Sequence, residues 1–176
     1  MKKPKITEIY EDRILTRNER NEYGQWETVQ KEMRYKKQVN DLSIGLRLVN
    51  FIIDSIFYYQ VLGRFLGELS IVNTNPIIEL VYLFSFPLYY TVCEYFFQKT
   101  LGKVFTQSIV VNEYGEKPDF KTIVVRTVIR FIPFEPFSFF SSNRGWHDKW
   151  TNTYVIRKFE LEKLLELAKN PENLKP

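Results

Sequence analysis

The sequence predicts an α-helical membrane protein: a transmembrane helical hairpin, an interfacial or re-entrant third segment, a short β/turn element between them, and polar cytoplasmic arms. Three observations lead to this fold class. Two apolar runs each exceed the roughly 18 to 20 residues that cross a hydrocarbon core. Lysine and arginine flank both runs but are nearly absent from the segment between them. Aromatic residues make up 16% of the chain, and Tyr and Trp near the ends of apolar runs suit a membrane interface.

The uneven distribution of charge divides the chain into three regions. Residues 1–41 form a polar cytoplasmic N-terminal arm, in which the turn signal "NERNEYGQ" indicates a β-hairpin. Residues 42–157 form the membrane domain, with spans at about 45–66 and 76–98, and residues 158–176 form an amphipathic helical C-terminal tail. The alternative is a soluble α+β domain with two long core helices. Core helices of this length usually have a polar face, which favours the membrane.

The first apolar run, "LRLVNFIIDSIFYYQVLG", carries polar residues on one face. Arg47, Asn50 and Asp54 follow the helical spacing i, i+3 and i+7. Lipid cannot satisfy such a stripe, so it must face protein or a water-filled cavity. Two interpretations remain open: a network that fixes helix packing, or an ion or proton site in which Asp54 titrates and Arg47 sets its charge. We expect Asp54 to be ionised and paired with an arginine: Arg47, Arg126 or Arg130.

The second apolar run, "PIIELVYLFSFPLYYTVCEYFFQ", begins at a proline suited to the first turn of a helix, and Pro87 in its interior predicts a kink. Glu94, near the inner end of this run, belongs to the candidate ion or proton site and is a candidate partner of Arg47. The positions of Lys and Arg predict a multi-pass protein with both termini in the cytoplasm and residues 67–76 outside.

The segments after the second run predict shorter elements. A strand at "SIVV" and a tight turn at "NEYGEKPD" follow, with a positive φ expected at Gly115. The amphipathic helix "FKTIVVRTVIRFI" places Arg126 and Arg130 on one face, where they pair with Asp54 or Glu94 or bind lipid phosphates. The third apolar segment, "FIPFEPFSFF", contains a glutamate and two prolines, so we expect it to be interfacial or re-entrant.

Four pieces taken in order, "RLVNFIID", "TLGKVFTQSIVVNEYGEKPDF", "RTVIR" and "WHDKWTNTYVI", resemble the RDD family of small bacterial membrane proteins, named for one arginine and two aspartates. The resemblance covers roughly residues 42–157 and rests on the order and spacing of the pieces. It implies residence in the bacterial inner membrane, with ion or small-solute transport proposed for some members. The family motif would comprise Arg47, Asp54, Gly102, Lys103, His147 and Asp148.

Other chemistries have little support in the sequence. No His, Cys and carboxylate cluster has metal-ligand spacing, and "TLGK" lacks the pattern of a phosphate-binding loop. His147 beside Asp148 is either a proton-handling pair or a turn contact. The formal net charge of +4 is modest and fits an anionic membrane face better than nucleic acid. We therefore expect no enzyme activity, no catalytic residues, no metal, no cofactor and no nucleic-acid partner.

Two functions remain in competition. The first is transport of an ion or small solute, with cation–proton exchange as its particular form, by a homo-oligomer in the lipid bilayer. Self-association is needed because two or three spans do not easily enclose a path. The second is a membrane-anchored interaction or assembly protein, whose charged residues are structural and whose polar arms bind a cytoplasmic or membrane protein.

Overall fold

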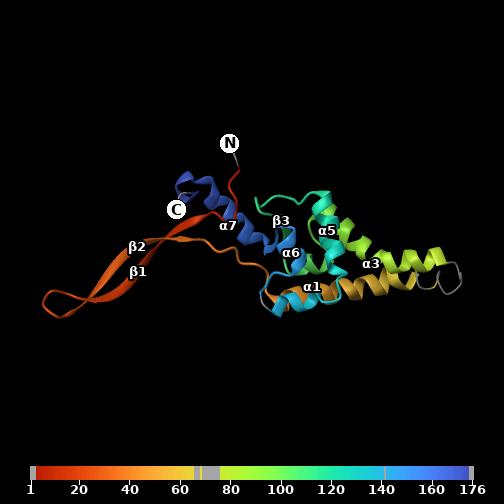
Figure 1. Cartoon of the computed structure of the whole chain (residues 1–176), viewed down its shortest axis with the longest axis horizontal. Helices are drawn as coiled ribbons and strands as arrows, with labels where there is room; N and C mark the ends of the chain where they lie inside the picture. Colours follow the sequence, from red (N-terminus) through yellow and green to blue (C-terminus); the bar gives the residue numbers. More distant parts are fainter. Residues whose placement is uncertain (1–2, 66–67, 69–75, 141, 175–176) are drawn as a thin grey trace. The chain divides into compact units, whose positions relative to one another are not determined.

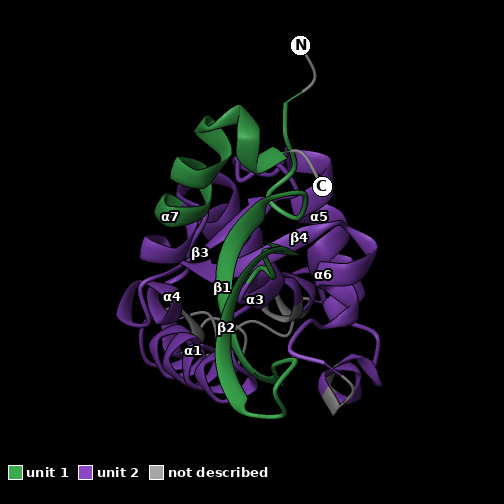
Figure 2. Cartoon of the chain, turned by 90° about the vertical axis from the view of Figure 1, so that its left-hand side faces the viewer, with its two compact units in different colours: residues 1–39, 162–176 green, residues 40–161 purple. Residues whose placement is uncertain are grey.

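The computed structural model describes residues 3–65, 68, 76–140 and 142–174, and these ranges hold six α-helices and two two-stranded antiparallel sheets (Figure 1). The chain forms two compact units, residues 1–39 with 162–176 and residues 40–161 (Figure 2). Every residue of the candidate site and of the family motif belongs to the second unit.

The first unit contains a long β-hairpin. Strands β1 (Tyr10–Arg20) and β2 (Trp26–Lys36) pair antiparallel along their whole lengths. The Asn21 side chain accepts hydrogen bonds from two backbone N–H groups of the turn, and Gly24 has a φ of 75° that side chains rarely adopt. The hairpin predicted from the turn signal is confirmed. The predicted C-terminal helix is α7 (Lys158–Lys169), which is followed by the 3₁₀-helix η3 (Pro171–Leu174).

The second unit is built from short helices around a small sheet. In chain order its elements are α1 (Ile44–Phe57), the π-helix η1 (Tyr58–Gly63), α3 (Pro76–Phe97), α4 (Leu101–Phe105), β3 (Ser108–Asn112), α5 (Phe120–Arg130), the 3₁₀-helix η2 (Glu135–Phe140), α6 (Trp146–Trp150) and β4 (Thr153–Arg157). The strand predicted at "SIVV" is β3, and it pairs antiparallel with β4. Gly115 in the turn that follows has a φ of 76°, as expected.

The predicted fold class, a transmembrane helical hairpin, is wrong. Within the described ranges, no helix is both long enough and apolar enough to cross a membrane. The regular part of the first run, α1, has 14 residues and covers about 21 Å at 1.5 Å per residue, because the chain changes to a π-helix at Tyr58. Helix α3 has 22 residues, but Tyr89, Tyr90 and Glu94 in its second half are buried against protein.

The other membrane elements of that prediction also need correction. The expected interfacial or re-entrant segment is the short helix η2, in which Glu135 and Ser138 are buried within the protein. The segment expected to face outward, residues 67–76, lies outside the described residues except for 68 and 76. The expectation that the polar stripe of the first run faces protein is confirmed, since Asn50 and Asp54 are buried. Hydropathy along the sequence does not show that the regular helix ends at Phe57, and that early end is what the prediction missed.

Helices α1 and α3 pack side by side through aromatic rings (Figure 1). Phe51 of α1 meets Phe86 of α3 edge to face, with ring centroids 6.4 Å apart. Tyr58, Tyr89 and Tyr90 form a buried cluster beside this contact. Helix α4 packs against the polar stripe of α1 at Asn50 and Asp54, and β3 with β4 supplies the aliphatic core around Val110 and Val155. The polar stripe of α1 therefore faces protein.

Candidate functional site

Glu94 on α3 is the centre of a buried ion cluster. Its Oε1 accepts hydrogen bonds from Lys103 Nζ at 3.0 Å and Arg130 Nη2 at 2.8 Å. Its Oε2 accepts one from Arg126 Nε at 3.3 Å. Burial raises the pKa of Glu94, but Arg130, Lys103 and Arg126 together outweigh burial and hold that pKa well below its usual range. Glu94 is therefore a carboxylate surrounded by three cations.

Asp148 on α6 is the second buried acid of the cluster. Its Oδ2 accepts a hydrogen bond from Arg47 Nη1 and its Oδ1 accepts one from Arg126 Nη1, each at 2.6 Å. Burial raises the pKa of Asp148, and His147, Arg126 and Arg47 lower it far below its usual range. Because Arg126 also binds Glu94, it joins the two carboxylates into one network. The expected pairing of Glu94 with Arg47 is wrong, since Arg47 reaches Asp148 instead.

Asp54 of α1 is fully buried and is held by neutral donors rather than by an arginine. Its Oδ1 accepts from Tyr89 Oη at 3.0 Å and from the Gly102 N–H at 2.8 Å. Its Oδ2 accepts from Tyr90 Oη at 3.2 Å and Thr100 Oγ1 at 2.5 Å. The expected arginine partner is therefore wrong. Helix α4 begins beside α1, and its unpaired first N–H groups supply what a distant cation was expected to supply.

Asn50 and Gly102 hold α1 and α4 together. The Asn50 side chain is buried, accepts from Thr106 Oγ1 at 2.7 Å and donates to Ser108 Oγ at 3.4 Å. A Cβ added at Gly102 would lie 2.2 Å from the Asn50 carbonyl oxygen. Gly102 is therefore required for close backbone approach, and Asn50 has a structural role at the same contact.

The His147 ring on α6 contacts the Glu135 carboxyl group of η2 as well as the carboxyl group of Asp148. Its Nδ1 lies 2.5 Å from Glu135 Oε1, and its Nε2 lies 3.5 Å from Asp148 Oδ1. Burial lowers the pKa of His147, and the nearby Asp148 opposes that effect only in part. Sequence reasoning noted Glu135 only as an interruption. The sequence did contain one indication of this contact: a charged residue within a Phe- and Pro-rich segment is expected to have a buried partner.

Asp41 and Arg144 also belong to the network and were not identified from the sequence. Asp41 Oδ1 lies 3.5 Å from Arg47 Nη2, and Asp41 Oδ2 lies 3.8 Å from Arg144 Nε. Burial raises the pKa of Asp41 to about 6, although Arg47 and Arg144 oppose this. Neither residue belongs to a helical or strand periodicity in the sequence, so only the folded chain shows their role.

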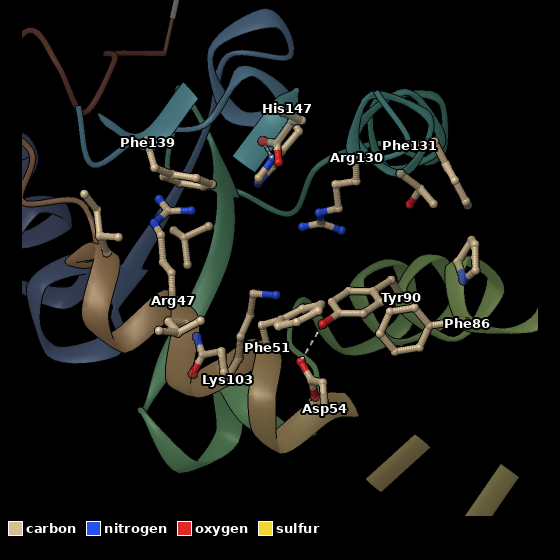
Figure 3. Close-up of a pocket in the computed structure, with 17 residues that line it drawn as sticks. Arg47, Phe51, Asp54, Phe86, Tyr90, Lys103, Arg130, Phe131, Phe139 and His147 are labelled. Atoms are coloured by element: carbon tan, nitrogen blue, oxygen red, sulfur yellow. Dashed lines mark hydrogen bonds and ion pairs between the residues drawn. The ribbon is translucent and has the colours of Figure 1, made fainter. Parts of the chain in front are cut away.

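A cavity of about 490 Å³ opens beside this network (Figure 3). Figure 3 shows the Lys103 ammonium and the Arg130 guanidinium directed into the same space, with the Arg47 guanidinium near Phe139. Its lining comprises Ile44, Arg47, Leu48, Asn50, Phe51, Asp54, Phe86, Pro87, Tyr90, Lys103, Thr127, Arg130, Phe131, Glu135, Phe139, His147 and Val155. The cavity thus combines apolar walls with three cationic side chains.

One of these cations has a donor atom without a partner in the described part of the chain. Arg130 Nη1 is buried and has no hydrogen-bond acceptor there, whereas Arg47 Nη2 faces Asp41 Oδ1 at 3.5 Å. Buried groups of this kind are normally paired, so Arg130 Nη1 points to an acceptor from outside the chain. In the same ranges, no three or more His, Cys, Asp and Glu side chains are placed to hold a metal ion.

The fold and the site define a small helical protein whose core is a network of arginines and carboxylates drawn from distant parts of the sequence. The chain belongs to the RDD family, whose sequence profile matches residues 42–152, well over half of the 176 residues. The resemblance described from the motifs is thereby confirmed, and membership suggests a membrane protein. No curated protein and no solved structure matches the chain.

Proposed function

We propose that this RDD protein binds a small anionic solute at the bacterial inner membrane, in the cavity beside Arg47, Lys103 and Arg130. The observation that carries the proposal is the convergence of Arg47, Lys103 and Arg130 on one cavity, together with the buried Arg130 Nη1, which has no acceptor among the described residues. Leaving a buried charged donor unpaired costs about 1–3 kcal/mol or more, and an anionic ligand would remove that cost.

The surroundings of the cations also suit an anion. The Arg47 side chain is only 10% exposed, so its charge is poorly screened by water. Arg130 and Lys103 lie over the ring of Tyr90, at 5.0 Å and 5.6 Å from its centroid, which holds both cations at the edge of the cavity.

An apolar surface on the second unit supports membrane association. Large apolar side chains are exposed along α1, α3 and α5, which is more than single scattered residues would give. They include Leu48, Val49, Phe51, Ile52, Ile56, Leu80, Val81, Phe84, Leu88, Val92, Phe96, Val125 and Val128. Contact with lipid would cover this surface, in agreement with the membrane association that family membership suggests.

Movement of the bound anion would make the protein a small-solute transporter. Cation–proton exchange at Asp54 has less support, because four donors already use both oxygens of that carboxylate. A cation would have to displace these donors before it could bind. An oligomer in the bilayer remains part of the transport proposal.

A second candidate, interaction with a partner protein, is favoured by the β1–β2 hairpin. Ile14, Leu15, Trp26 and Met33 are exposed on this two-stranded ribbon. Both strands have an edge of unpaired backbone groups that another strand can join. A pull-down with the hairpin residues replaced by serine would separate this role from anion binding.

Anion binding is tested by calorimetric titration and thermal unfolding of the purified protein with acetate, phosphate and chloride. We expect at least one anion to raise the unfolding temperature in a concentration-dependent way. Arg130→Gln should weaken binding about tenfold or more, and Arg157→Gln, an exposed arginine on β4, should not. The intact protein failing to bind any anion, of whatever size, would refute the proposal.

A further inference from the structure

We infer that the ligand of this cavity is a single-chain amphiphile with an anionic head, for which carboxylate and phosphate monoester are the two head groups of matching chemistry. The inference rests on the anion binding proposed above and specifies the class of anion. The head would occupy the space between Arg47, Lys103 and Arg130, and the chain would lie along the apolar wall.

The walls of the cavity do not suit a small hydrophilic anion. Four phenylalanine rings, Phe51, Phe86, Phe131 and Phe139, are part of the cavity lining, and Phe139 lies beside the Arg47 guanidinium (Figure 3). An inorganic anion would lose water to these rings without gaining a contact from them. An alkyl chain gains from the same contact, by about fourfold in affinity for each methylene that it buries.

The size of the cavity also favours a ligand with an alkyl chain. Its volume of about 490 Å³ lies within the range of roughly 300–1,000 Å³ that is typical of sites for drug-sized ligands. Acetate or phosphate would fill a small part of it. A head group on the cations therefore leaves room for a chain of several carbons.

The mouth of the cavity is apolar on its outer side. Leu48, Phe51 and Phe131 line the cavity and are also 57%, 53% and 52% exposed. They continue the exposed apolar surface of α1 and α5 into the cavity. A ligand that enters past these residues and reaches buried cations must be apolar at one end and anionic at the other.

The cations that line the cavity fix the position of the head. Glu94 holds Arg130 and Lys103, and Asp148 and Asp41 hold Arg47. Arg130 Nη1 has no acceptor among the described residues. These contacts orient the cations before the ligand arrives.

The test compares probes that differ in one property. Decanoate, decyl phosphate, acetate and 1-decanol are titrated into the full-length protein in a neutral detergent, by calorimetry at constant detergent concentration. We expect decanoate or decyl phosphate to bind at least 100-fold more tightly than acetate, and 1-decanol to bind at least tenfold more weakly than decanoate. A further titration in nanodiscs, with and without phosphatidylglycerol, shows whether a two-chain membrane lipid competes for the site.

Two neighbouring substitutions supply the matched variants. Leu48→Trp fills the mouth of the cavity, and Val49→Trp adds the same bulk at an exposed position that does not line the cavity. Leu48→Trp should lower the affinity for decanoate at least tenfold and leave the affinity for acetate unchanged. Unchanged acetate binding also shows that the variant is folded. Val49→Trp should change the affinity for neither ligand.

The outcomes distinguish this inference from the function on which it rests. Equal affinity for acetate and decanoate overturns the inference that the ligand is an amphiphile, but the proposal of anion binding stands. Absence of binding by every anion overturns both the inference and the proposal. Equal affinity for decanoate and 1-decanol, or an unchanged decanoate affinity in Leu48→Trp, also overturns the inference.

Discussion

Glu94 and Asp54 are both fully buried carboxylates, yet the protein stabilises their charges in different ways. Glu94 accepts hydrogen bonds from three cations, and Asp54 accepts them from two phenols, a hydroxyl and a backbone N–H. The contrast determines what each residue contributes. Loss of Glu94 leaves buried positive charges without a counter-ion, whereas loss of the Asp54 charge leaves neutral donors without a full acceptor.

We therefore predict that Glu94→Gln destabilises the protein more than Asp54→Asn does. The expected losses in free energy of unfolding are about 3–5 kcal/mol for Glu94→Gln and about 1–3 kcal/mol for Asp54→Asn. Chemical denaturation of the two variants in the same detergent measures the difference. If Asp54→Asn proved the more damaging, the cluster around Glu94 could not be the main polar support of the core.

Asp41 gives a second prediction at the same scale, because its pKa is raised from 3.8 to about 6 by burial. The folded protein holds the Asp41 proton more tightly than the unfolded chain, so this contribution to stability is full below pH 3.8 and is lost as pH rises through about 6. We predict that the stability of Asp41→Asn relative to the unmodified protein increases between pH 4 and 6 and is constant above pH 7. The full change is about 3 kcal/mol, at ~1.4 kcal/mol per pKa unit.

Thermal or chemical unfolding at a series of pH values tests this expectation. The contributions of other titrating groups, including His147 with its lowered pKa, are common to the two proteins and cancel when they are compared at each pH. A stability difference that did not vary with pH would mean that Asp41 is not buried as the structure has it.

The sequence predicted much of the residue-level chemistry of the site but only part of its pairing. Arg47, Glu94, Arg126 and Asp148 were identified as candidates, and they form one connected network. The pairing of Arg126 and Arg130 with Glu94 was among the expected contacts and is confirmed. The partners expected for Asp54 and Arg47 were wrong, because helical spacing shows which face a residue occupies, but not which segment packs against that face. That information is absent from local sequence patterns.

At the scale of elements, local signals gave correct predictions where a short stretch determines its own conformation. The hairpin turn, the strand at 108–112 and the amphipathic helix α5 depend on turn residues and on periodicity within about ten residues. The change from α1 to the π-helix η1 and the short helix α4 were not foreseen. Each depends on contacts with other segments, as the approach of α4 to Asn50 shows.

The contact between α1 and α4 gives a prediction about Gly102. A methyl group at this position would lie 2.2 Å from the Asn50 carbonyl oxygen, and that atom is backbone. Gly102→Ala must therefore separate the two helices and lengthen the hydrogen bond from the Gly102 N–H to Asp54. We expect a loss of about 2–4 kcal/mol in the free energy of unfolding, in the range of overpacking combined with a weakened buried hydrogen bond.

Gly45 in α1 is the matched control, because no atom lies within 4 Å of a Cβ built there. Gly45→Ala should be neutral or stabilise the protein by up to about 1 kcal/mol, since alanine favours a helix. Comparison of the two variants by denaturant unfolding isolates the close approach from the general effect of removing a glycine. Equal effects of the two substitutions would disprove the close contact.

At the scale of the whole molecule, hydropathy correctly located the apolar segments but not their architecture. The same residues that suggested two spans, such as Ile52, Ile56 and Leu80, are exposed on the surface of the second unit. The polar residues between them are buried inside it. Helical spacing in the sequence distinguishes these two sides, but hydropathy does not show that the regular helix of the first run ends at Phe57. That early end separates the predicted hairpin from the observed fold.

This exposed apolar surface yields the last prediction. If it contacts lipid, replacing Ile52, Ile56 and Leu80 with serine should lower the fraction of protein that floats with vesicles of neutral and anionic phospholipid. All three side chains are 46–59% exposed and none lines the cavity, so folding and anion binding should be retained. The apolar area removed from lipid contact corresponds to about 1 kcal/mol or more per side chain, enough to reduce binding at least tenfold in total.

Serine at Ile14 and Leu15, which are exposed on the β1–β2 hairpin, is the control and should leave flotation unchanged. Equal loss of flotation in both variants would assign membrane contact to general hydrophobicity, and unchanged flotation in the first variant would exclude this face of α1 and α3 as the site of contact.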